Sequence, residues 1–170
     1  MDSNININQK ISNKEMKQYR VHKIPVDTVA LAIKNGFSVY TYDNKKTNPE
    51  YFNISRNVNF NNTTRGIIIG DDINKILVSD NQSYKYKRFV TTYLLGLYLV
   101  EREPNFIRYY DVNNLNIEAL SYAENVLVPN TSLEKEIRKS KEINFEKLEE
   151  VFGVPDFIIR EKVKYLERRR

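Results

Sequence analysis

The chain of 170 residues contains no cysteine and only one histidine, His22. Without cysteine no disulfide framework can form, and this composition suits a reducing compartment. A zinc site built from imidazole and thiolate ligands cannot be assembled from a single histidine and no cysteine. The sequence also lacks a glycine-rich phosphate loop and a nucleophile–histidine pair. We therefore expect neither a cofactor nor an enzymatic activity.

Long hydrophobic runs are also missing. No segment reaches the ~20 apolar residues that a membrane-spanning helix needs. Met1–Gln18 is polar and lacks the apolar core of a secretory signal. These absences predict a cytoplasmic protein with no membrane contact. The formal net charge of +5 is compatible with an acidic partner, but does not decide between nucleic acid and protein.

The composition that remains is typical of a folded globule, with 41% hydrophobic and 12% aromatic residues. The asparagine-rich stretch over residues 1–20 predicts a flexible N-terminus. Residues 21–170 have a length suited to one domain with a hydrophobic core of its own.

The most apolar stretch is Arg88–Val100, which reads R-F-V-T-T-Y-L-L-G-L-Y-L-V. Apolar and aromatic side chains occupy most of its helical circumference, a pattern typical of a helix buried on most sides. At about thirteen residues it is too short to span a bilayer, which needs ~20. The stretch therefore predicts a central core helix.

This stretch resembles the central helix of the ImmA/IrrE family of zinc peptidases, which reads R-F-[ST]-x-A-H-E-x-G-H-Y-L-[LV]. In that register the H-E-x-x-H positions fall on Tyr93, Leu94 and Leu97. Leucine neither ligates a metal nor transfers a proton, so the zinc ligands and the general base of the family are absent. The positions that match the family are Arg88, Phe89, Gly96, Tyr98 and Leu99.

The elements on either side follow the order of that family. Pro25-Val26-Asp27 predicts the start of a helix whose Val26, Val29, Ala30 and Ile33 share a face, with Gly36 as its cap. Further along the chain we expect strands at Phe37–Tyr40, Phe52–Phe60, Gly66–Ile69, Lys75–Val78 and Phe106–Val112, and helices at Ile117–Val128 and Leu133–Lys141. We predict an α+β, zincin-like fold: a small mixed or antiparallel sheet packed on the central helix, plus C-terminal helices.

A second matching segment is E-A-L-S-Y-A-E-N-V-L-V-P, similar to the family pattern E-A-N-x-F-A-x-x-L-L-M-P. The resemblance places Glu118 at the third zinc ligand and Tyr122 at the phenylalanine. One carboxylate does not hold zinc on its own. Glu118 is expected to be solvated or hydrogen-bonded to the Tyr93 hydroxyl, and the former active-site positions Tyr93, Leu94, Leu97, Glu118 and Tyr122 form a candidate binding cleft or fill it.

Two other segments allow nucleic-acid binding. Tyr84, Lys85, Tyr86, Lys87 and Arg88 interleave aromatic and basic residues in the link before the central helix. The C-terminal segment predicts two helices around Gly153-Val154-Pro155, a helix–turn–helix pattern with Asp156–Leu166 as the second helix and Arg168, Arg169 and Arg170 available for phosphates. A solvated basic segment and a structural pair that packs onto the sheet, as the resemblance implies, are the alternatives.

The resemblance implies a catalytically inactive pseudopeptidase that acts by binding protein. Active members of the family cleave helix–turn–helix repressors of mobile elements or stress genes. The expected partner is therefore such a repressor, with this protein as a phage or mobile-element antirepressor, or a host defence protein that it inhibits. The alternative is a nucleic-acid-binding transcriptional regulator.

Overall fold

The computed structural model describes residues 23–43, 52, 54, 58, 64–70, 74–101, 103, 105–140 and 142–168. This part contains one four-stranded mixed sheet and six helices, so the predicted α+β class is confirmed. The described residues leave out His22, Arg169 and Arg170, the N-terminus that was expected to be flexible, and most of the strand expected at Phe52–Phe60. The elements are α2 (Thr28–Lys34), β1 (Ser38–Tyr42), β2 (Gly66–Gly70), β3 (Lys75–Ser79), α3 (Tyr84–Glu101), β4 (Phe106–Tyr109), α4 (Ile117–Leu127), α5 (Asn130–Ile137), α6 (Phe145–Phe152) and α7 (Asp156–Glu167).

The sheet has the strand order β1-β3-β2-β4. β1 runs parallel to β3, whereas β2 is antiparallel to both β3 and β4. β2 and β3 are buried along their whole length because both faces of the sheet are covered. Ile68 and Ile76 belong to the main core on the helical side, and Ile67 and Leu77 to a smaller core on the other face. This explains why both strands are hydrophobic without alternation.

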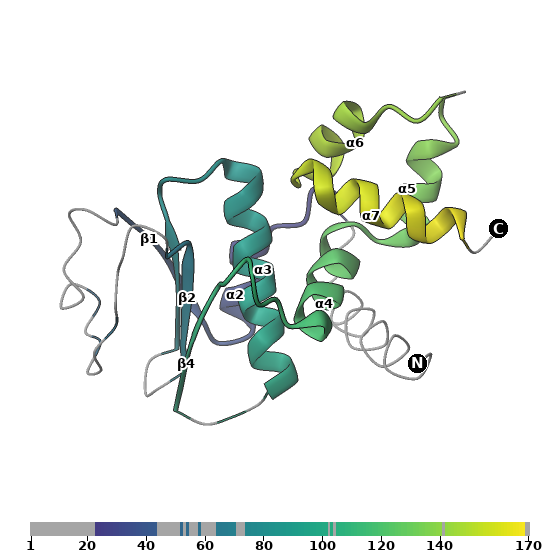
Figure 1. The fold of residues 1–170 in the computed structure, drawn as a ribbon. Coiled ribbons are helices and arrows are strands. Elements are labelled where there is room, and N and C mark those ends of the chain that lie inside the picture. Colours follow the sequence, from purple (N-terminus) through teal and green to yellow (C-terminus); the bar gives the residue numbers. More distant parts are fainter. Residues whose placement is uncertain are drawn as a thin grey trace.

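The central helix α3 begins at Tyr84, earlier than the apolar pattern alone indicated. The Ser83 hydroxyl accepts a hydrogen bond from the Tyr86 backbone N–H at 3.3 Å, as an N-cap residue does. The basic segment Lys85–Arg88, expected as part of a link, therefore forms the first turns of α3. Figure 1 shows α3 between the sheet and α4, so the prediction that the sheet packs on this helix is confirmed.

The helix α2 starts later than expected and buries a different face. Asp27 is its N-cap, with its carboxylate accepting from the Ala30 N–H at 2.9 Å. Val29 and Ile33 are 45% and 59% exposed, while the buried residues are Thr28, Leu31 and Ala32. The predicted apolar face was wrong for Val29 and Ile33, whereas Val26, which precedes the helix, is fully buried. A helix this short satisfies more than one periodic pattern, and the neighbouring α3 and β1 select which face is buried.

The C-terminal helices lie on the side of α3 and α4 away from the sheet (Figure 1). The two predicted helices are present as α6 and α7, joined through Gly153, which adopts the left-handed conformation with φ 61° and ψ 45°. The expectation that this pair packs onto the sheet is wrong. Its contacts go to α3 and α4 instead, through side chains described below.

Candidate functional site

Most of the positions that the resemblance aligns with the family's active site lie where α3 contacts α4. Tyr93, Leu94, Leu97 and Tyr122 are each no more than 5% exposed and belong to the main core. The two helix backbones approach closely here, since a Cβ atom added to Gly96 would lie 2.9 Å from the Ala119 carbonyl oxygen. Tyr93, Leu97 and Tyr122 therefore fill the space between the helices, whereas Leu94 points towards Gly66 of β2. None of the four lines an accessible cleft.

An aromatic cluster extends this packing from Tyr93 towards α7. It consists of Tyr86, Phe89, Tyr93, Tyr110 and Phe157. The Tyr93 and Tyr110 rings are 5.4 Å apart, and those of Phe89 and Phe157 are 5.1 Å apart, both edge to face. The hydroxyls of Tyr86 and Tyr110 are hydrogen-bonded at 2.8 Å. Edge-to-face pairs add to the stabilisation that burial provides, so the cluster is a rigid filling of this region.

The Tyr93 hydroxyl bonds to the start of α4. It accepts a hydrogen bond from the Asn116 backbone N–H at 2.8 Å, and the Asn116 side chain in turn caps α4 by accepting from the N–H groups of Glu118 and Ala119. Burial raises the pKa of Tyr93. In the part of the chain that the structure describes, no hydrogen bond joins the Glu118 carboxylate to Tyr93. Glu118 is partly exposed at the rim of the filled region.

The residues at this site do not fit a catalytic zinc ion. The two side chains one helical turn apart are a phenol held by Asn116 and an aliphatic chain, and the position of the general base is Leu94, which is fully buried. Zinc in such sites is bound by imidazole, thiolate or carboxylate groups. Among the described residues no group of three or more such side chains is placed to hold a metal ion.

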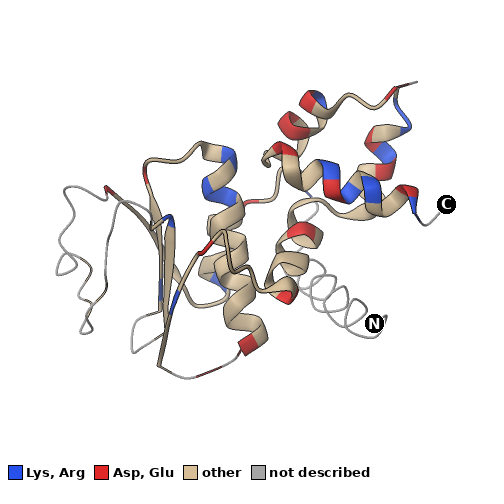
Figure 2. Cartoon of the chain, in the orientation of Figure 1, with Lys and Arg blue, Asp and Glu red and all other residues tan. Residues whose placement is uncertain are grey.

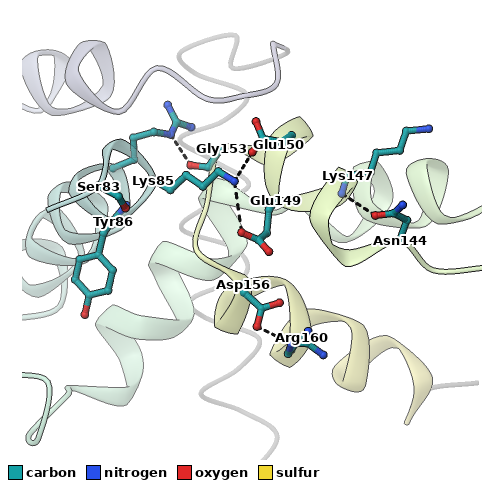
Figure 3. A network of polar contacts seen from close by, with 11 residues as sticks. Ser83, Lys85, Tyr86, Asn144, Lys147, Glu149, Glu150, Gly153, Asp156 and Arg160 are labelled. Carbon is teal, nitrogen blue, oxygen red and sulfur yellow. Dashed lines mark hydrogen bonds and ion pairs between the residues drawn. The ribbon is translucent and has the colours of Figure 1, made fainter.

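The cations of the basic segment are engaged within the protein. Lys85 contacts Glu149 at 3.4 Å and Glu150 at 2.5 Å on α6, and its hydrogen bond to Glu150 raises its pKa. Figure 3 shows this ammonium group pointing between the two carboxylates. Lys87 is 2.8 Å from Asp80. Tyr86 belongs to the aromatic cluster, so Tyr84, at 69% exposed, is the most accessible residue of the segment.

Arg88 is buried and joins α3 to the turn between α6 and α7. Its guanidinium donates from Nε to the Gly153 carbonyl at 2.8 Å and from Nη2 to the Phe152 carbonyl at 3.3 Å. These carbonyls stand at the C-terminus of α6, where a cation is favoured by the helix dipole. Arg88 is only 5% exposed. Its role is therefore to hold the C-terminal helices against α3.

The helix–turn–helix pair does not expose a basic face. Along the solvent side of α7, Arg160 pairs with Asp156 and Lys164 with Glu161. Figure 2 shows acidic and basic residues alternating along this helix. Arg168 is exposed at its C-terminus, whereas Arg169 and Arg170 lie outside the described residues. Alternating charges of this kind give no net attraction to phosphate.

A buried polar contact connects α4 to α7. Lys162, only 3% exposed, donates to the Asn125 side-chain oxygen at 2.9 Å. Burial raises the pKa of the neighbouring Glu124 to about 7, although the charge of Lys162 acts in the opposite direction. Sequence reasoning missed these residues, because nothing in a charged helical pattern indicates which lysine faces a distant helix.

The shifted Glu124 predicts a pH-dependent stability. The folded protein retains the proton of Glu124 up to about pH 7, whereas the unfolded chain releases it near the ordinary glutamate pKa. Protonated Glu124 therefore contributes fully to the free energy of unfolding below the ordinary glutamate pKa. This contribution is lost as pH rises through the raised pKa of the folded state. Relative to Glu124→Gln, the wild type should lose about 2 kcal/mol of stability between pH 5 and 8. Urea unfolding at both pH values measures this, and parallel curves for the two proteins would contradict it.

Comparisons with family models and with curated proteins give no match. No family model matches this chain, and no curated protein is significantly similar to it. The resemblance to ImmA/IrrE domains accordingly rests on the residues quoted above. Within the residues described, none of the helices combines the length and hydropathy that crossing a bilayer requires.

Proposed function

We propose that this protein is a catalytically inactive, ImmA/IrrE-like protein that acts in the cytoplasm by stoichiometric binding to another protein. The partner class is a helix–turn–helix repressor, in which case the protein is an antirepressor of a phage or mobile element, or a host defence protein that it inhibits. The observation that carries this proposal is the filling of the region beside the central helix by Tyr93, Leu94 and Leu97.

This filling supports binding without cleavage. Tyr93 is hydrogen-bonded to Asn116 and packs edge to face against Tyr110, while Leu94 is buried in the main core beside Gly66 of β2. A peptidase needs an accessible, hydrated position for its metal-bound water and substrate carbonyl. Side chains that occupy this volume leave the surrounding frame intact as a scaffold for recognition.

The nucleic-acid alternative has less support. Lys85 and Lys87 are in ion pairs and Arg88 is bonded to backbone carbonyls, so binding phosphate through this segment would first require breaking those contacts. Binding of phosphates releases counterions and weakens steeply with added salt. Salt dependence therefore separates the two classes.

The function is tested by mixing the purified protein with repressor-type proteins encoded beside its gene and with their operator DNA. Size-exclusion chromatography is run at about 0.1 M and about 0.5 M NaCl, which bracket physiological ionic strength. We expect a protein complex that persists at the higher salt concentration. Mass spectrometry should find both chains intact. A cleaved partner would contradict the proposal that the protein is catalytically inactive. A salt-sensitive complex with DNA alone would favour the alternative, a nucleic-acid-binding transcriptional regulator.

The family register predicts that zinc binding can be restored. Tyr93→His with Leu97→His places two imidazoles one turn apart, facing the turn of α4 that carries Glu118. We expect one zinc ion per chain and about 2.7 kcal/mol of added stability at a hundredfold excess over the dissociation constant. Thermal unfolding with and without zinc measures this effect.

The matched controls are the wild type and the double variant with Glu118→Gln. The wild type should show no zinc-dependent stabilisation, and loss of the third ligand should weaken binding at least about tenfold. A folded double variant that ignores zinc would show that these positions do not correspond to the family site.

A further inference from the structure

A groove of about 590 Å³ lies on the other side of α3 from the filled site. Val39, Thr41 and Val78 of the sheet form its floor, Val29 of α2 one wall, and Tyr84 and Thr91 of α3 the other. Tyr84 and Thr91 are two turns apart on one helical face, whereas Tyr93 projects from the opposite face. The groove is therefore separate from the former active-site positions.

The strand β1 borders this groove, and none of the described strands covers its outer edge. Ser38 donates its N–H to the Asn74 carbonyl at 3.0 Å, and the Tyr42 carbonyl accepts from Asp80 at 2.8 Å. In a parallel ladder alternate residues face the same neighbour. The N–H and C=O groups of Val39 and Thr41 therefore point away from β3, and within the described part of the chain no strand pairs with them.

The charged residues that line the groove are Lys23, Asp27, Lys87 and Arg88. Lys87 is paired with Asp80, and Arg88 donates to the carbonyls of Gly153 and Phe152. Asp27 is engaged at the N-terminus of α2, where it accepts from the Ala30 N–H at 2.9 Å. Lys23 is exposed at the end of the groove. Lys23 is therefore the cation available to a ligand, and its charge favours an acidic residue at this point.

We propose that the groove binds an extended segment of the partner protein that carries aliphatic residues, and one acidic residue, at alternate positions, added as a further strand along β1. The outward N–H and C=O groups of Val39 and Thr41 form the main-chain hydrogen bonds. Alternate aliphatic side chains enter over Val29 and Val78, and an acidic residue lies near Lys23. Strand addition of this kind takes affinity from the backbone and specificity from alternate side chains. This inference rests on the proposed protein-binding function and names its surface.

The test uses a displayed library of random heptapeptides selected on the wild-type protein. The enriched peptides should carry aliphatic residues at alternate positions with one acidic residue among them, and the best one, synthesised, should shift the amide resonances of Val39 and Thr41 in NMR spectra. Thr41→Pro removes an outward N–H without touching the ladder to β3, a position where an edge strand tolerates proline. It should weaken peptide binding at least about tenfold.

A second variant does not alter the backbone. Val29→Glu places a carboxylate at the groove wall and should also weaken binding at least about tenfold. Val112→Glu, at another exposed valine before α4, is the matched control and should bind as the wild type does. The inference would be overturned if Thr41→Pro and Val29→Glu bound the peptide as tightly as the wild type does, or if the selection enriched basic peptides. A dimer in sedimentation that Thr41→Pro abolishes would assign the edge to a second copy of the chain and overturn it too.

These measurements distinguish failure of the proposed groove from failure of the proposed protein-binding function. If the repressor complex forms equally well with Val29→Glu, the protein-binding function stands and this surface is wrong. If selected peptides bind at β1 but no intact partner complex is found, the groove stands and the proposed function fails.

Discussion

Replacing Arg88 with methionine is expected to destabilise the protein by about 3 kcal/mol. Methionine fills a similar volume but donates no hydrogen bond, so the carbonyls of Gly153 and Phe152 lose the partners that they have at 2.8 and 3.3 Å. The α6 C-terminus also loses the cation that its dipole favours. The free energy of unfolding in urea, followed by circular dichroism, measures this effect.

Lys87→Met is the matched control for Arg88→Met. It removes the ammonium group of Lys87, whose partner Asp80 has a side chain that is 49% exposed. Such surface ion pairs contribute ~1 kcal/mol or less, so this variant should stay close to the wild type. If Arg88→Met were no less stable than Lys87→Met, the structural role of Arg88 would be refuted and its availability for nucleic acid would return as an explanation.

Gly96→Ala is expected to destabilise the protein by about 2–3 kcal/mol, although alanine is the better helix former by about 1 kcal/mol. The added Cβ would lie 2.9 Å from the Ala119 carbonyl oxygen and 3.2 Å from its Cα. Both atoms are backbone, so the contact is relieved only by moving α3 and α4 apart. That movement would loosen the packing of Tyr93 and Tyr122 as well.

The sign of the Gly96→Ala effect is decisive. Urea unfolding should show a lower midpoint than the wild type, and near-ultraviolet circular dichroism should show a weaker tyrosine signal if the aromatic packing loosens. An increase in stability would mean that helix propensity dominates and that α3 and α4 are not in close contact at this position.

The secondary structure was predictable where the local pattern is strong. The strands at β2 and β3 and the helix α4 were expected within a residue or two, because continuous β-branched runs and a capped periodic segment constrain the backbone directly. The face of α2 was not predictable. Val29 and Ile33 fit a helical period as well as Leu31 and Ala32 do, and only the packing of neighbouring elements distinguishes them.

The amino-acid sequence by itself determined that the two histidines and the glutamate of an H-E-x-x-H motif are absent from the central helix, because positions 93, 94 and 97 hold a tyrosine and two leucines. Only the tertiary structure decided what those residues do instead. Tyr110 and Phe157 reach Tyr93 and Phe89 from distant parts of the chain, and Arg88 reaches Gly153. Such contacts depend on how the elements pack together, which local patterns in the sequence do not specify.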